Sequence, residues 1–134
     1  MRAQAALEYM ILIGFLLAVL VPMIVLFYSK SSETSAQVRS EQAKALGQKI
    51  ADSAESVYYL GQPSKFQFRA NVPDGISSVN FTDKEIAFRI QLVPGTTDVV
   101  IPSTVNLSGS IKTSVGVHLI TVENKGTYVF VNST

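Results

Sequence analysis

The chain of 134 residues has no cysteine and no tryptophan, and His118 is its only histidine. Without cysteine it can form neither disulfides nor thiolate metal sites, and one histidine cannot build a histidine metal cluster. Its 11 basic and 10 acidic residues nearly balance, and no cluster of lysine or arginine is present to neutralise nucleic-acid phosphates. We therefore predict no metal, no cofactor and no nucleic-acid partner.

Sequence patterns of catalysis are missing as well. The chain contains no phosphate-binding loop and no Gly-x-Ser-x-Gly motif, and its many serines and threonines have no histidine or lysine partner in a known arrangement. Asp74 and the Asp83-Lys-Glu85 stretch match no calcium-loop spacing and are expected to lie in polar turns. His118 is expected on a strand, at the surface. We predict that the chain is not an enzyme.

One long apolar run stands near the N-terminus. No charged residue occurs from Met10 to Tyr28, so a helix here has no polar face. At about 1.5 Å per residue, the run of about 20 residues from Tyr9 matches the thickness of a bilayer's hydrocarbon core. It is longer than the apolar region of a typical secretory signal peptide. We predict a membrane-spanning helix over residues 4–28.

Three residues add detail to this helix. Arg2 precedes the run and favours a cytoplasmic N-terminus with the rest of the chain outside. Pro22 removes one helix hydrogen bond, which predicts a kink or local melting around residues 18–22. Gly14 would let a neighbouring helix approach closely.

Glu8 lies at the edge of the apolar run, where a carboxylate is either hydrated at the headgroup level or paired with a positive charge. Gln4, Glu8 and Leu12 follow Arg2 and Ala3. The stretch resembles the start of archaeal type IV pilins with a class III signal peptide, in which a basic and a small residue precede a cleavage point and Gln-x-Ser-x-Glu-x-x-x-Leu follows. The chain departs from that pattern in three ways: Ala3 replaces the commoner glycine, Ala6 the usual serine, and the leader is only residues 1–3.

This resemblance implies how the chain is processed and assembled. A prepilin peptidase would cut between Ala3 and Gln4, so that Glu8 becomes the fifth residue of the mature protein. In such pilins this glutamate pairs with the N-terminal amine of a neighbouring subunit. The hydrophobic helices, with Leu12 and Gly14 at their contacts, would then pass from the membrane into the core of a helical homo-oligomeric filament on the cell surface.

Residues 29–62 are predicted to continue the helix as an amphipathic segment. Apolar residues recur there at spacings of three and four, namely Ala43, Leu46, Ile50, Ala54 and Val57. Two alternatives remain open: the serine-rich residues 29–35 form a linker, or Thr34 and Gln37 form a capping box that starts a second helix. Gly61 and Pro63 are expected to end the helix.

Residues 63–134 change to an alternating pattern and are predicted to form a small β-rich head. Alternation marks strands at residues 65–72, 86–92 and 115–119, and residues 128–131 return as the second strand of a hairpin. Shorter strands are expected at residues 79–81, 98–101 and 105–107, and turns at residues 73–75 and 94–95. The fold class is thus α+β: a long hydrophobic helix followed by an antiparallel, sandwich-like head.

Three Asn-x-Ser/Thr sequons, at Asn80, Asn106 and Asn132, lie in the part that is predicted to be outside the cell. They are candidate sites of N-glycosylation. We expect the chain to be a major or minor structural subunit of an archaeal type IV pilus-like filament. The alternative is a single-pass membrane-anchored domain that binds a ligand or partner outside the cell, in which Glu8 would be incidental.

Overall fold

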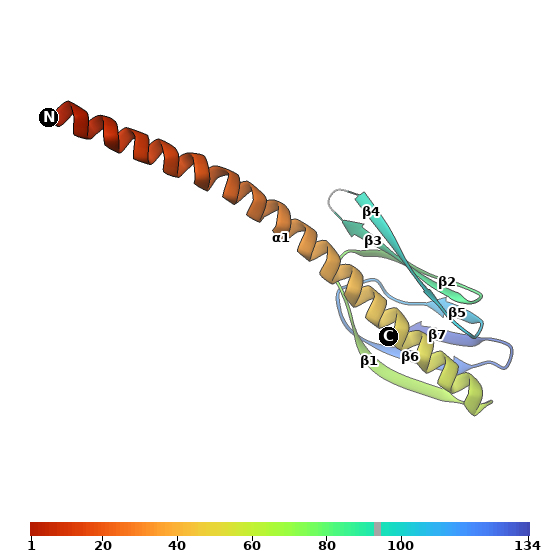
Figure 1. Ribbon diagram of the computed structural model, residues 1–134. Coiled ribbons are helices and arrows are strands. Elements are labelled where there is room, and N and C mark those ends of the chain that lie inside the picture. The colour runs from red at the N-terminus through yellow and green to blue at the C-terminus, as the bar shows by residue number, and fades with distance from the viewer. Residues whose placement is uncertain (93–94) are drawn as a thin grey trace. The chain divides into compact units, whose positions relative to one another are not determined.

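The computed structural model describes residues 1–92 and 95–134 and confirms the α+β class (Figure 1). One helix is followed by seven strands: α1 (Arg2–Leu60), β1 (Lys65–Val72), β2 (Ile76–Thr82), β3 (Glu85–Leu92), β4 (Gly95–Pro102), β5 (Leu107–Ser110), β6 (Gly116–Asn124) and β7 (Val129–Ser133). The expected turn at residues 94–95 includes Pro94, which lies outside the described residues.

The chain forms two compact units, Met1–Ser35 and Ala36–Thr134. The first unit is helical, and residues 18–22 keep their helical backbone, so local melting at Pro22 does not occur, while the alternative of a kink stays a prediction. A proline removes a single hydrogen bond of the helix, and proline is common in apolar helices of the membrane-spanning type.

The serine-rich residues 29–35 are also helical, which excludes both the linker and the capping box. Thr34 Oγ1 donates a hydrogen bond to the carbonyl oxygen of Lys30 at 2.9 Å, and Ser35 Oγ donates to that of Ser31 at 3.0 Å. Each hydroxyl thus bonds to the turn before it instead of capping a new helix. Lys30 Nζ also pairs with Glu33 at 2.9 Å.

The strands of the second unit form two sheets, with the orders β1-β6-β7-β5 and β2-β3-β4. The predicted β6–β7 hairpin is confirmed, with Asn124 opposite Val129. Pairing is antiparallel except between β5 and β7, which run parallel. That parallel pair was not expected, because it joins strands separated along the chain by β6.

Two strand predictions need correction. The short strands expected at residues 79–81 and 98–101 lie inside the longer β2 and β4, but the strand expected at residues 105–107 begins only at Leu107. Val105 lies in a loop and its side chain is buried, and its carbonyl oxygen accepts a hydrogen bond from Ser103 Oγ at 3.0 Å. On β6, Val117 is 68% exposed, and Ile120 and Val122 face the core instead.

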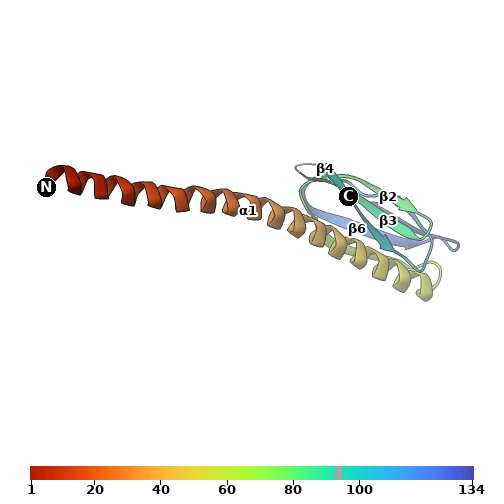
Figure 2. The ribbon, with the colours of Figure 1, turned by 45° about the horizontal axis from the view of Figure 1, so that its top comes forward.

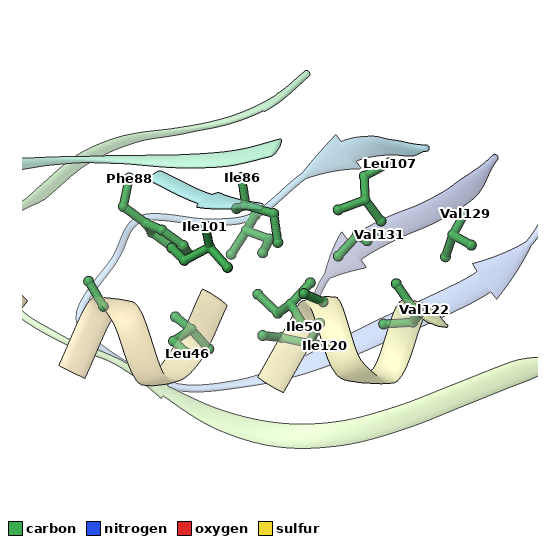
Figure 3. Packing of buried hydrophobic residues seen from close by; sticks show 14 of the residues in the cluster. Leu46, Ile50, Ile86, Phe88, Ile101, Leu107, Ile120, Val122, Val129 and Val131 are labelled. Carbon is green, nitrogen blue, oxygen red and sulfur yellow. The ribbon is translucent and has the colours of Figure 1, made fainter. Parts of the chain in front are cut away.

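A single core joins the helix to both sheets. Residues of α1 at the predicted spacings are buried there: Ala43, Leu46, Ile50, Ala54 and Val57. Figure 3 shows Leu46 and Ile50 pointing toward buried side chains of β3 and β4, including Phe88 and Ile101. Residues 36–60 therefore belong to the same compact unit as the strands, which lie along this part of the helix in both ribbon views (Figures 1 and 2).

Gly47 sets how closely α1 approaches the β2-β3-β4 sheet. A Cβ atom added to Gly47 would lie 2.5 Å from Ile101 Cδ1 and 2.7 Å from Phe88 Cε2. Real Cβ contacts are not that short, so a larger residue would displace the helix or those two side chains. The glycine lowers helix propensity but lets the core pack tightly.

We expect Gly47→Ala to destabilise the protein by up to about 2 kcal/mol, because overpacking costs about 1–3 kcal/mol and the gain in helix propensity offsets about 1 kcal/mol of it. Denaturant unfolding of the full chain in detergent, followed by circular dichroism, measures the change. Gly14→Ala is the matched control, since nothing lies within 4 Å of a Cβ at Gly14. Equal stability of the Gly47→Ala and Gly14→Ala proteins would contradict the close approach.

Candidate functional site

The residues proposed for cleavage and assembly all lie in the first unit, on α1. Gln4, Glu8 and Leu12 are exposed and, at intervals of four residues, share one stripe of the helix. Gly14 lies about 120° around the helix from Glu8, given about 100° per residue. The structure thus brings three of these residues onto one face and places Gly14 on another.

The proposed cleavage bond between Ala3 and Gln4 lies in the first turn of α1. The first four N–H groups of a helix have no partner within it, so this turn unwinds with the loss of few hydrogen bonds. One bond that would be lost joins the Ala5 N–H to the carbonyl oxygen of Met1, at 3.3 Å. Helical structure around Ala3 is therefore compatible with access by a peptidase.

The apolar side chains from Leu7 to Tyr28 are exposed. Every large apolar residue from Leu7 to Tyr28 is at least 42% exposed, and together they surround the helix. The segment is long enough and apolar enough to cross a membrane. Apolar surface of this extent on a helix without a polar face is compatible with membrane anchoring.

The three sequon asparagines are all exposed, but their settings differ. Asn80 lies within β2, opposite Ala87 of β3. Asn132 lies within β7, which has β6 on one side and β5 on the other. Asn106 lies outside the strands, between β4 and β5.

Asn124 has a role that the sequence did not reveal. It is 5% exposed, and its Nδ2 donates hydrogen bonds to the carbonyl oxygens of Val57 and Tyr58, each at 3.2 Å. Its Oδ1 accepts a bond from the Gly126 N–H at 2.7 Å. Asn124 thus satisfies carbonyls of the last turn of α1 from the end of β6, and ties the helix to the hairpin.

An open groove of ≈ 700 Å³ runs between the last turns of α1 and the start of β1. Its apolar part includes Val57, Leu60 and Phe66, of which Phe66 is 49% exposed. Lys49 lines the groove as well, and its Nζ lies 4.9 Å from the centre of the Phe68 ring, a cation–π contact. The groove combines apolar surface with a few charged groups.

Ion pairs order the exposed surface of the head. Arg89 donates two hydrogen bonds to Asp98 across β3 and β4, at 2.9 and 3.0 Å, and these bonds lower the pKa of Asp98 below its ordinary value of 3.8. Because the folded-state pKa is the lower one, the pair stabilises the fold above the ordinary pKa, and this effect is lost as pH falls through the folded-state value. Both groups are exposed, so the effect is small.

The other polar residues considered from the sequence are scattered. His118 is half-buried, and its Nε2 lies 2.8 Å from the carbonyl oxygen of Ser114 and 3.2 Å from Ser114 Oγ. Asp74 pairs with Arg39 at 3.2 Å. Within residues 1–92 and 95–134, no three His, Asp or Glu side chains come together in an arrangement that would hold a metal ion.

Comparison of the chain with protein-family models, with curated proteins and with solved structures found no match.

We expect Asn124→Ala to destabilise the protein by about 2–4 kcal/mol, because it removes the amide bonds to the carbonyls of Val57 and Tyr58 and the acceptor of the Gly126 N–H, and of these carbonyls that of Tyr58 keeps a bond from the Gly61 N–H. Denaturant unfolding in detergent measures the loss. Asn80→Ala is the matched control, as Asn80 is an exposed strand asparagine. If both variants unfold at the same denaturant concentration, Asn124 does not hold the end of the helix.

Proposed function

We propose that the chain is a structural subunit of an extracellular filament of the archaeal type IV pilus kind, assembled through residues 4–28. The subunit is held in the membrane before assembly, with its head outside. The observation that carries this proposal lies in the first unit: residues 9–28 of its helix present exposed apolar side chains on all sides, with no cover within the described chain.

Glu8 supports a filament over a simple anchor. A membrane-spanning helix gains nothing from a carboxylate at its edge, whereas a bundle of such helices requires the carboxylate to be paired. Cleavage after Ala3 supplies the partner, because it creates a positively charged amine on Gln4. The match of Gln4, Glu8 and Leu12 to the pilin pattern is the second support.

A second candidate function is a membrane-anchored domain that captures a ligand outside the cell. The groove between α1 and β1 favours it, since ≈ 700 Å³ lies within the range of about 300–1,000 Å³ typical of ligand pockets. In that case the N-terminal peptide stays uncut, and the groove, not the helix, is the functional surface.

Glu8→Ala and Glu8→Lys are expected to abolish filaments while leaving the protein in the membrane. Removing one partner of a buried pair costs about 3–5 kcal/mol per contact, whereas membrane insertion depends on the apolar run. Negative-stain microscopy of sheared surface material and membrane fractionation measure the two outcomes. Glu41→Ala, an exposed position further along α1, is the control and should assemble normally. Normal filaments from the Glu8 variants would rule out the pairing role.

Mass spectrometry of the mature protein is expected to show an N-terminus at Gln4. Ala3→Gly should be processed in the same way, because it keeps a small residue before the cut, whereas a bulky Ala3→Leu should block cleavage. A protein that retains Met1 in the membrane would contradict processing at this bond and favour the anchored binding domain.

A further inference from the structure

Two open hollows of the head meet at Asn106. The first, of ≈ 480 Å³, is lined by Asn106 and Ser108 together with Phe81, Thr82 and Tyr128, among others. The second, of ≈ 620 Å³, also includes Asn106. The strands that bring these segments together are β2 and β5, which are neighbours in the head. Volumes of this size suit a small ligand.

The backbone at Asn106 is held in place while its side chain is free to react. Its carbonyl oxygen accepts a hydrogen bond from the Val129 N–H at 2.8 Å, and the next residue, Leu107, donates its N–H to the carbonyl oxygen of Asp83. In the described part of the chain, the Asn106 side chain makes no hydrogen bond and is exposed. Its amide is therefore presented on a fixed backbone.

The two residues of the Asn106 sequon that take part in recognition line one hollow. Asn106 and Ser108, two residues apart, both belong to the lining of the hollow of ≈ 480 Å³. Asn80 and Asn132 instead project from paired strands, and neither lines the two hollows.

We propose that Asn106 carries an N-linked glycan and that its first pyranose ring packs in the hollow against Tyr128. The Tyr128 ring is 39% exposed, and the C–H face of a sugar ring packs well against an aromatic face. Thr82, Asp83 and Thr127, which also line the hollow, offer polar groups to the sugar hydroxyls.

The donor of the sugar in the attachment step is a lipid-linked sugar phosphate. The Asn106 amide nitrogen forms a bond to the anomeric carbon, and the bond from that carbon to the donor phosphate oxygen breaks. The phosphate leaves with the electron pair, and the amide proton passes to the transferase. The modification rests on the proposed location of the head outside the cell, where such transferases act.

Site occupancy is tested on the full chain, expressed in cells that have an oligosaccharyltransferase and isolated with their membranes. A peptide N-glycosidase converts each glycosylated asparagine into aspartate, and peptide mass spectrometry then reads all three sequons. We expect glycan at Asn106 in the wild type and none there in Ser108→Ala, which removes only the sequon hydroxyl, while Ser108→Thr keeps it. Glycan at Asn80 or Asn132 with Asn106 unmodified would overturn the proposal.

The hollow is tested by the thermal midpoint of unfolding. Glycosylated protein should unfold about 3–6 °C above the Ser108→Ala protein, and both should unfold together when made in cells without the transferase. Tyr128→Phe should keep this difference, and Tyr128→Ala should lose it. A difference that survives in Tyr128→Ala would show that the sugar does not pack against that ring.

Protease added to intact cells separates this proposal from the proposed function. If the head is digested and Asn106 bears no sugar, the glycan proposal fails alone. If the head is protected on intact cells but is digested after the cells are lysed, the location is wrong and both proposals fail. If the cells carry a glycosylated head but form no filaments, the glycan proposal stands and the filament proposal fails.

Discussion

The head depends on one contact, the packing of the α1 stripe from Ala43 to Val57 against both sheets. Two small sheets of short strands cannot shield both of their inner faces without a further layer. The stripe supplies that layer, and its residues share one core with Phe88 and Ile101 from one sheet and Val122 and Val131 from the other. The helix thereby joins two sheets that have separate hydrogen-bond ladders.

Two single residues fix the helix in this contact. Gly47 determines how deep the helix lies, because any side chain there would meet Ile101 and Phe88. Asn124 ties the last turn of the helix to the β6–β7 hairpin, because its amide bonds to the carbonyls of Val57 and Tyr58. Gly47 thus controls the distance between the helix and the β2-β3-β4 sheet, and Asn124 controls the position of the helix along its own axis. Together they make the packing of an otherwise uniform apolar stripe specific.

Features that repeat along the chain could be predicted, because burial on one side leaves a period in the sequence. The stripe of α1 and the β6–β7 hairpin are examples. Thr34 could not be assigned, since a hydroxyl that bonds backward within a helix and one that caps a new helix follow the same pattern. Alternation on β6 did not say whether Val117 or Ile120 faces inward. The stripe of Gln4, Glu8 and Leu12 follows from spacing, whereas the hollow at Asn106 combines three separate segments and has no local signature.

The two parts of α1 differ in how their apolar surface is covered. Residues 36–60 have one apolar side, which the sheets of the same chain bury, whereas residues 9–28 are apolar all around and need cover on every side. A bilayer or a bundle of like helices provides it. A smooth apolar helix in a bundle could slide along its neighbours, since no axial offset is preferred. In the proposed filament, Glu8 lies one turn, about 6 Å, from the new amine on Gln4. Pairing of those charges between neighbours favours one offset, and so turns a non-specific apolar contact into a defined helical assembly.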